Sequence, residues 1–473
     1  MTRPFSAVSL IWLLLIDQSM AVSVAGFAPV AETAFKKFQD MKSGTFICLL
    51  FLAVVFCSCS QKQKISTEKD YVHLLDGKYF NKQDSRLKKE TAFWADRLNK
   101  DTASYVNLME LGRCYLAEFK LNADVNRLLA GDSLIKAASA RLNHTEPEIL
   151  FALSQNSITR HQFKEAALRN SDATHAGGNL YTICLLGFDV NMELGNYDLA
   201  LKQLEQLKDK KSFDYLIRRA KWEDHTGNLD KAIALMEEAA QKTRNSRVAA
   251  SWVQSNLGDM YGHAGEVKKS YQSYLSVLEN EPANFHCLQG IAWIAFAQDG
   301  DVDAARKIIS FILKYYPEPG LYLQLAEIAA SEGKSGEQKM YENKFLDLVK
   351  NDRYGNMYNQ YKIDILASQP EAGDAALRLA GQELKNRFTP ETADRYALAL
   401  LSTGQVEKAY QFAKAYVYRR CFEPLVLLHT ARIFIAAGHQ DEARELLLSC
   451  EESTFELGPV KMKTVNKLLS FLP

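Results

Sequence analysis

Apolar and small residues recur along most of the chain at the three- and four-residue spacing of amphipathic helices, and no run of strand-type alternation competes with them. A short pattern punctuates these helices: a Gly, an apolar residue two positions later, and an Ala three positions after that. It occurs as GNYDLA from Gly195, GNLDKA from Gly227, GDVDAA from Gly300 and GQVEKA from Gly404. The pattern predicts a first helix that ends at the Gly, which adopts left-handed backbone easily, and a second helix that packs closely through the Ala.

The spacing of these glycines gives the length of a repeat. Looser copies begin at Gly265 and Gly438, so successive copies start at positions 195, 227, 265 and 300, and the last two start at 404 and 438. The resulting period of about 34 residues resembles that of the tetratricopeptide repeat, a helix–turn–helix unit. Pro282 and Pro317 follow Gly265 and Gly300 by half a period, where that family ends its second helix.

In the unit of Gly265, Leu257, Gly258 and Tyr261 form the L-G-x-x-Y of a first helix. Further copies are degenerate, because the units at His161 and Gly333 depart from the pattern. The gap from Gly333 to Gly404 spans two periods and leaves room for one more unit without a Gly signature. The resemblance implies an all-α, tetratricopeptide-type helix–turn–helix solenoid, a right-handed superhelix of about ten units over residues 105–473.

Two apolar stretches precede the repeats, at residues 8–16 and 45–59. Each is shorter than the roughly 18 apolar residues of a membrane-spanning helix. In the second stretch Met41 and Lys42 supply a start and a charge, and Ser58 and Cys59 follow the apolar core, ahead of the polar run SQKQKISTEKD. This resembles a bacterial lipoprotein signal with Cys59 as the lipidated residue, although Phe56 stands where Leu is usual.

This interpretation divides the chain into three parts. Residues 1–58 hold an N-terminal extension and the signal, with 41–58 as the lipoprotein-like signal and 1–40 as a mis-called extension before the true start. Residues 59–104 form a polar tether and a lead-in helix, and residues 105–473 form the solenoid. Two alternatives stay open: Met1 is the start of a weak two-pass or signal-anchor protein, or the signal is cleaved without lipidation.

Composition and missing motifs argue against several kinds of functional site. Lys plus Arg and Asp plus Glu both number 57, so the basic excess of a nucleic-acid binder is missing. Five of the eight cysteines lie beyond the N-terminal stretch with no C-x-x-C pair, which predicts small buried residues and not a zinc or disulfide framework. The chain has no H-E-x-x-H or G-x-S-x-G motif, and Gly333-Lys334-Ser335 lacks the upstream Gly of a phosphate loop. We therefore predict a non-enzyme with no catalytic residue, metal or cofactor.

A binding surface is the expected functional feature. In the tetratricopeptide family the first helix of each unit lines a concave groove, and counting back from the repeat Gly gives the corresponding positions here. Trp252 is a candidate anchor in that groove, with packing between repeats as an equal alternative. The implied groove residues combine apolar groups with both charge signs: Ile217, Lys221, Trp252, Ser255, Asp259, Asp394, Leu398, Leu428 and Arg432.

These features predict a membrane-tethered scaffold or adaptor that binds a peptide or an envelope protein in its repeat groove. Its expected location is the bacterial cell envelope, lipid-anchored and facing the periplasm. The alternative is a carbohydrate- or nutrient-capture lipoprotein that works beside an outer-membrane transporter. Such proteins resemble this chain in repeats and anchor but usually carry long insertions, for which the nearly constant spacing of the repeat glycines leaves little room.

Overall fold

A residue in left-handed conformation marks the turn inside nearly every helix pair of the computed structural model, which describes residues 64–243 and 245–472. The repeat glycines from Gly195 to Gly438 have φ between 67° and 85°, in the region where a side chain is strained. Two earlier turns use Ala123 and His161 instead, with φ of 56° and 54°. The predicted turns are thus confirmed, and the same geometry extends to turns without Gly.

Within the described residues, ten helix pairs follow one another along the chain. The first helices are α5 (Tyr105–Asn122), α7 (Pro147–Thr159), α9 (Leu180–Leu194), α11 (Phe213–His225), α13 (Arg247–His263), α15 (Phe285–Trp293), α17 (Gly320–Ser331), α19 (Asn359–Ala367), α21 (Pro390–Ser402) and α23 (Pro424–Ala436). The second helices are α6 (Val125–Arg141), α8 (Phe163–His175), α10 (Tyr197–Glu205), α12 (Leu229–Lys242), α14 (Val267–Asn280), α16 (Val302–Tyr315), α18 (Ser335–Val349), α20 (Gly373–Asn386), α22 (Val406–Tyr416) and α24 (Gln440–Glu451). This part of the chain contains no strand, so the all-α repeat fold is confirmed.

Additional helices flank and interrupt the pairs. The short α3 (Glu68–Tyr71) and the long α4 (Lys78–Lys100) precede the array, and α25 (Thr454–Phe471) follows it with a kink at Gly458. Other short segments are the 3₁₀ turns Val72–Leu74, Asp352–Tyr354 and Pro370–Ala372 and the π-helical turn Ile294–Gln298. The turn Pro370–Ala372 joins α19 to α20, which explains why this unit has no Gly signature.

Close contacts between helices rest on small residues at defined places. A Cβ atom on Gly258 of α13 would lie 2.5 Å from the ring of Tyr274, and one on Gly290 of α15 would lie 2.4 Å from the same ring. Tyr274 of α14 therefore fits between two first helices only because neither carries a side chain at that place. Its ring belongs to a core cluster that includes Leu288, Ile291 and Ile308, each of which contributes about 1.5–3 kcal/mol by burial.

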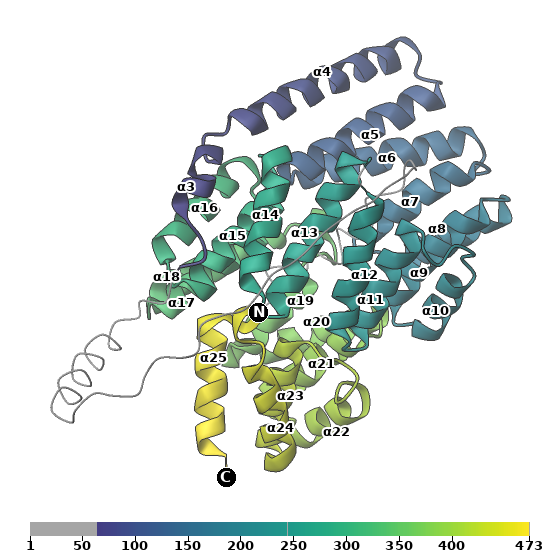
Figure 1. Ribbon diagram of the computed structural model, residues 1–473. Helices are drawn as coiled ribbons and strands as arrows, with labels where there is room; N and C mark the ends of the chain where they lie inside the picture. The colour runs from purple at the N-terminus through teal and green to yellow at the C-terminus, as the bar shows by residue number, and fades with distance from the viewer. Residues whose placement is uncertain (1–63, 244, 473) are drawn as a thin grey trace, which may run out of the picture.

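The array curls until distant repeats meet. In Figure 1 it runs from α4 at the top to α10 on the right, returns through α11–α18 and descends to α21–α24. The C-terminal α25 (yellow) packs against α13, α17 and α23, and Trp293 donates from Nε1 to the carbonyl of Phe455 at 3.0 Å. Leu128 of α6 shares a core cluster with Leu323 of α17. The interior of the curl is therefore enclosed by both early and late repeats.

Two sequence-based predictions concern single residue types. The five described cysteines, Cys114, Cys184, Cys287, Cys421 and Cys450, are free and buried, as predicted, although Cys421 lies in the loop before α23 and not on a helix. Cys59 and the signal-like segment fall outside the described residues. None of the helices within the described part of the chain combines the length and the apolar character needed to cross a bilayer.

Candidate functional site

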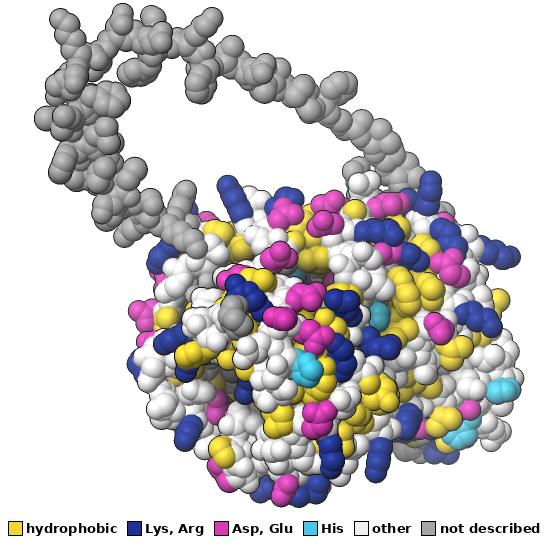
Figure 2. Space-filling view, turned by 90° about the horizontal axis from the view of Figure 1, so that it is seen from below, with side chains coloured by type: hydrophobic (Ala, Val, Ile, Leu, Met, Phe, Trp, Pro, Cys, Tyr) yellow, Lys and Arg dark blue, Asp and Glu magenta, His cyan; other side chains and the backbone are white. Residues whose placement is uncertain are grey.

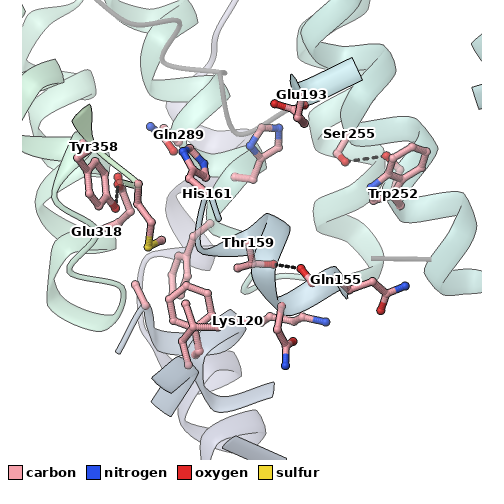
Figure 3. A pocket seen from close by; sticks show the side chains of 18 of the residues that line it. Lys120, Gln155, Thr159, His161, Glu193, Trp252, Ser255, Gln289, Glu318 and Tyr358 are labelled. Carbon is pink, nitrogen blue, oxygen red and sulfur yellow. Dashed lines mark hydrogen bonds between the residues drawn. The ribbon is translucent and has the colours of Figure 1, made fainter. Parts of the chain in front are cut away.

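The first helices of the pairs enclose a central cavity of about 1550 Å³. Its walls come from α5, α7, α9, α11, α13, α15, α17 and α19, and the starts of α21 and α23 together with α25 complete the enclosure. Figure 3 shows side chains from these helices and from the turns and loops beside them, among them Lys120, His161, Trp252 and Glu318, around one open space. The curl of the array thus deepens a concave groove into a large, partly open cavity.

An ion-pair network closes one side of this cavity. Glu193, at the end of α9, accepts from Lys221 Nζ at 3.0 Å and from Arg387 Nη1 at 3.2 Å. Burial alone would raise the pKa of the Glu193 carboxyl, but the two cations lower it below its ordinary value. The Arg387 guanidinium also lies 5.0 Å from the ring centroid of Phe163. All three ion-pair partners line the cavity.

Three of the nine predicted groove residues line the cavity: Lys221, Trp252 and Ser255. Trp252 is 8% exposed and meets Phe213 of the preceding pair edge to face at 6.1 Å. The packing between repeats is therefore confirmed, and Trp252 also forms part of the cavity wall, while its role as an anchor for a partner stays a prediction. Ser255 Oγ donates to the Trp252 carbonyl at 2.8 Å, as Figure 3 shows.

Asp259 lies behind the wall and supports a cavity residue. Its carboxylate is buried, accepts from the Tyr274 hydroxyl at 2.7 Å and lies 3.0 Å from His286 Nε2. Burial lowers the pKa of His286, but the Asp259 carboxylate raises it above the ordinary value overall. His286 itself lines the cavity, so Asp259 orients its ring and favours its protonated form.

The other predicted positions lie outside the lining. Ile217, Leu398 and Leu428 are buried at 2%, 5% and 4% exposure among packed apolar side chains. Asp394 is fully buried and lies 2.8 Å from His429 Nδ1, whereas Arg432 is exposed away from the cavity. Contact of any of the nine residues with a partner stays a prediction.

No protein-family model matches the chain, and no curated protein sequence matches it. Among solved structures, it is similar to a tetratricopeptide repeat protein from Parabacteroides merdae, with 15% identity and a TM-score of 0.32 over 55% of this chain and 97% of that chain. Yeast Tom70 aligns with 13% identity and a TM-score of 0.33 over 86% and 95% of the two chains. The human IFIT1 dimer with PPP-AAAA aligns with 14% identity and a TM-score of 0.41 over 66% and 72%.

The internal geometry decides the fold: successive helix pairs, a left-handed turn residue in nearly every pair, and a nearly constant spacing of the repeat glycines. The fold is a tetratricopeptide-type solenoid. In this tetratricopeptide frame Ile217 and Lys221 stand ten and six residues before Gly227.

The same count identifies lining residues that the Gly pattern missed. Ten and six residues before the turn residues Ala123 and His161 lie Arg113, Ala117, Phe151 and Gln155, all of which line the cavity. The signal was present in the sequence but hidden, because these two turns lack Gly. Loop residues such as Glu318 carry no repeat signal and follow only from the fold.

Glu318 and Tyr358 form a buried polar pair in the wall. The Tyr358 hydroxyl donates to Glu318 Oε1 at 2.6 Å, as Figure 3 shows. Burial raises the pKa of the Glu318 carboxyl above its ordinary value, so the Tyr358 hydroxyl, together with the backbone amides of Gly320 and Leu321, only partly stabilises its charged form. The tetratricopeptide-type cavity therefore presents both carboxylates and cations to an occupant.

Charge on the outside is equally mixed. On the face drawn in Figure 2, Lys and Arg side chains lie among Asp and Glu side chains, and no single sign prevails. Among the residues that the structure describes, no group of three or more His, Cys, Asp or Glu side chains could hold a metal ion. What the site offers is a large chamber whose apolar, aromatic and charged groups suit the binding of an extended ligand.

Proposed function

We propose that the protein is a membrane-tethered scaffold that holds a peptide, or a loop of another envelope protein, in its central cavity. The observation that carries this proposal is the large, partly open cavity lined by the first helices of successive repeats. Its mechanism is binding alone, without a catalytic step or a cofactor. The tetratricopeptide-type solenoid presents an extended inner surface, which is the surface that such repeat arrays use for ligands.

The size of the cavity favours an extended ligand. Pockets for drug-sized molecules measure about 300–1,000 Å³, whereas this cavity measures about 1550 Å³. Its lining combines aromatic rings such as Phe119 and Trp252 with amides and charges of both signs. A peptide segment supplies the matching set of groups, because it has a main chain of donors and acceptors and side chains of varied chemistry.

The tether is proposed from the sequence pattern. A lipoprotein-like signal would make Cys59, just before the first described residues, the lipidated residue, and the anchor would hold the protein in the bacterial envelope, facing the periplasm. Ile65 and Ser66 donate their backbone N–H groups to Asp299 at 2.9 and 2.8 Å. The chain therefore leaves the array beside the turn before α16, which would set the side of the solenoid that meets the membrane.

Site-specific photo-crosslinking in living cells tests the binding cavity. A benzophenone amino acid replaces Trp252 in one variant and Leu199 in the control, because Leu199 is 52% exposed on α10 and lies outside the lining. We expect one dominant protein adduct at position 252 and none of the same mass at position 199. Equal adducts at both positions, or none at position 252, would remove the cavity as the binding site.

The anchor needs a separate measurement. Mass spectrometry of the purified mature protein should find an N-terminal peptide that begins at a lipid-modified Cys59, and Cys59→Ala should move the protein from the membrane fraction to the supernatant. A wild-type protein that retains residues 1–40 would instead favour the signal-anchor alternative. Because this experiment does not involve the cavity, its failure leaves the binding proposal standing.

A carbohydrate-capture role is the second candidate, and the aromatic lining is what favours it. Phe151, Tyr354 and Tyr361 line the cavity along with Gln155 and Asn156, so planar faces and amide groups face one chamber. Isothermal titration with a panel of oligosaccharides distinguishes the two roles. Saturable heat with a glycan, in the absence of any cavity crosslink to protein, would favour capture of carbohydrate.

A further inference from the structure

Lys120 stands apart from the other cations that line the cavity. It lies near the end of α5, and among the described residues it has no hydrogen-bond or ion-pair partner. The side chain is exposed at the cavity surface, but the surrounding protein still lowers the pKa of its ammonium, and no carboxylate opposes that effect. The remaining Lys and Arg side chains of the lining all have a carboxylate partner: Arg113 with Glu110, Lys221 and Arg387 with Glu193, Arg395 with Asp364, and Lys461 with Glu327.

The side of α5 that carries Lys120 borders two core clusters. Leu116 lies one helical turn before Lys120 and shares its face of α5. Leu116 packs against a cluster that contains Leu153 of α7 and also against a second cluster that contains Leu323 of α17. The face of α5 that carries Lys120 therefore borders two core clusters, one with residues of α7 and the other with residues of α17.

Both neighbouring helices place an unsatisfied amide in the wall beside these contacts. Gln324 follows Leu323 on α17, is 6% exposed, and has no partner for Nε2 or Oε1. Asn156 of α7 is also 6% exposed, and its Nδ2 has no partner. Both residues line the cavity. Buried polar groups are normally paired, so orphaned amide atoms on two helices point to a missing occupant.

We propose that Lys120, Asn156 and Gln324 form an anion subsite that receives a carboxylate of a bound peptide. The Lys120 ammonium pairs with the carboxylate, and Asn156 Nδ2 donates a second hydrogen bond to it. The Gln324 amide turns toward the ligand and exchanges hydrogen bonds with a peptide unit of its main chain. This inference rests on the proposed function, since it names the chemistry of the peptide that the cavity holds.

The choice of a carboxylate follows from the charges. An ammonium without a counterion in a cavity wall is stabilised most by an anion that also accepts hydrogen bonds. The carboxylate has two sources, an Asp or Glu side chain and the free carboxyl end of a peptide. The Gln324 amide favours a peptide over other anions, because its donor and acceptor match the N–H and C=O of one peptide unit.

Selection from random peptide libraries tests the subsite on the folded wild-type protein. One library has its carboxyl ends fused to the carrier, and a second library has free carboxyl ends. If the carboxylate comes from a side chain, we expect Asp or Glu to be enriched at a fixed position in the first library. If it comes from the chain end, we expect binding peptides to be enriched only in the second library. A selected pool without acidic residues in either library would overturn the subsite.

Charge reversal separates a binding role from a structural one. Lys120→Glu should switch the selected pool to Lys and Arg, and Lys120→Met should weaken a selected acidic peptide by at least about tenfold. Lys202→Met is the matched control, because Lys202 is exposed on α10 outside the lining. If the Lys120 variants select the same peptides as the wild type, the subsite is wrong but peptide binding stands.

Gln324→Leu gives an independent readout in the free protein. Removal of an unsatisfied buried amide should raise Tm by about 1 °C while weakening the acidic peptide several-fold. A lower Tm would mean that the Gln324 amide already has hydrogen-bond partners, and would remove Gln324 from the subsite.

If the wild type selects no peptide at all, the proposed function fails with the subsite. Binding of an oligogalacturonate that Lys120→Met abolishes would then reassign the anion to a sugar acid.

Discussion

Arg387 and Glu193 form an ion pair between Nη1 and Oε2 at 3.2 Å that joins two distant parts of the sequence. Arg387 lies in the loop between α20 and α21, and Glu193 lies at the end of α9, so the pair connects an early repeat to the late repeats. The side chains are 12% and 8% exposed. A tetratricopeptide-type array that could remain an open spiral is therefore locked into a closed form at this point.

Removal of Arg387 should loosen this closure. Arg387→Met leaves Glu193 buried with Lys221 as its remaining partner, so we expect the free energy of unfolding to fall by about 1–3 kcal/mol. Urea unfolding followed by circular dichroism measures the change. Arg419→Met is the control, because Arg419 and its partner Glu445 are 71% and 60% exposed and such pairs contribute about 0–1 kcal/mol. Equal losses in both variants would contradict a special role for the closure.

Two glycines with similar backbone angles should respond differently to Ala. Gly458 has φ of 70° in α25, and a Cβ atom there would lie 2.9 Å from the Trp293 ring. Gly438 has φ of 85°, and a Cβ atom there would meet nothing within 4 Å. We expect Gly438→Ala to lower the free energy of unfolding by about 1 kcal/mol through backbone strain, and Gly458→Ala to lower it by about 2–4 kcal/mol through strain and overpacking.

Thermal unfolding of the two Ala variants, compared with the wild type, measures this difference. A loss of α25 docking in Gly458→Ala should also expose the Trp293 indole, with a red shift of its fluorescence, because its Nε1 bond to Phe455 is broken. Indistinguishable Tm values for the two variants would show that the contact between Gly458 and Trp293 is not tight.

Acid should destabilise the protein through His161. Burial and the Arg387 guanidinium lower the pKa of His161 from 6.5 to about 4, although the carboxylates of Glu193 and Glu383 act in the opposite direction. Between these pH values the unfolded chain binds a proton that the folded protein excludes. The free energy of unfolding therefore falls as pH drops below 6.5, by about 1–3 kcal/mol from this residue.

His161→Asn removes the titration and keeps a residue that tolerates the positive φ of this turn. We expect the variant to lose less stability than the wild type between neutral pH and pH 5 in urea titrations. His144→Asn serves as the control, because His144 has a similar φ of 59° but is exposed. A parallel pH dependence in His161→Asn and the wild type would contradict the buried neutral state.

Asp299 should control the attachment of the N-terminal strap, residues 64–67. It follows the π-helical turn Ile294–Gln298 and accepts from the backbone of Ile65 and Ser66 and from Ser66 Oγ at 2.9, 2.8 and 2.6 Å. Asp299→Ala should speed hydrogen exchange in the strap by on the order of tenfold or more, with little change elsewhere. Asp303→Ala, at an exposed position on α16, should leave the strap protected.

The repeat units could be predicted from the sequence because their signals are local. Gly195 and Gly227 each end a first helix within a few residues of the Ala that packs the second helix, and both links lie inside one period. Even the unit without Gly, α19 with α20, was predicted from the length of the gap, although its 3₁₀ turn Pro370–Ala372 was not. The groove frame identified Lys221, Trp252 and Ser255 as lining residues.

Only the tertiary structure decided how the array closes and what the cavity contains. Each repeat adds a small rotation, and the sum over all the repeats determines whether Glu193 reaches Arg387 or remains at an open surface. No local sequence pattern encodes this summed rotation of the repeats. Ile217, Asp394 and Ser255 all stand ten residues before their repeat Gly, yet only Ser255 lines the cavity. The neighbours of each residue depend on the accumulated curvature of the array. The unpaired Lys120 arises for the same reason, since its surroundings come from helices that lie far away along the chain.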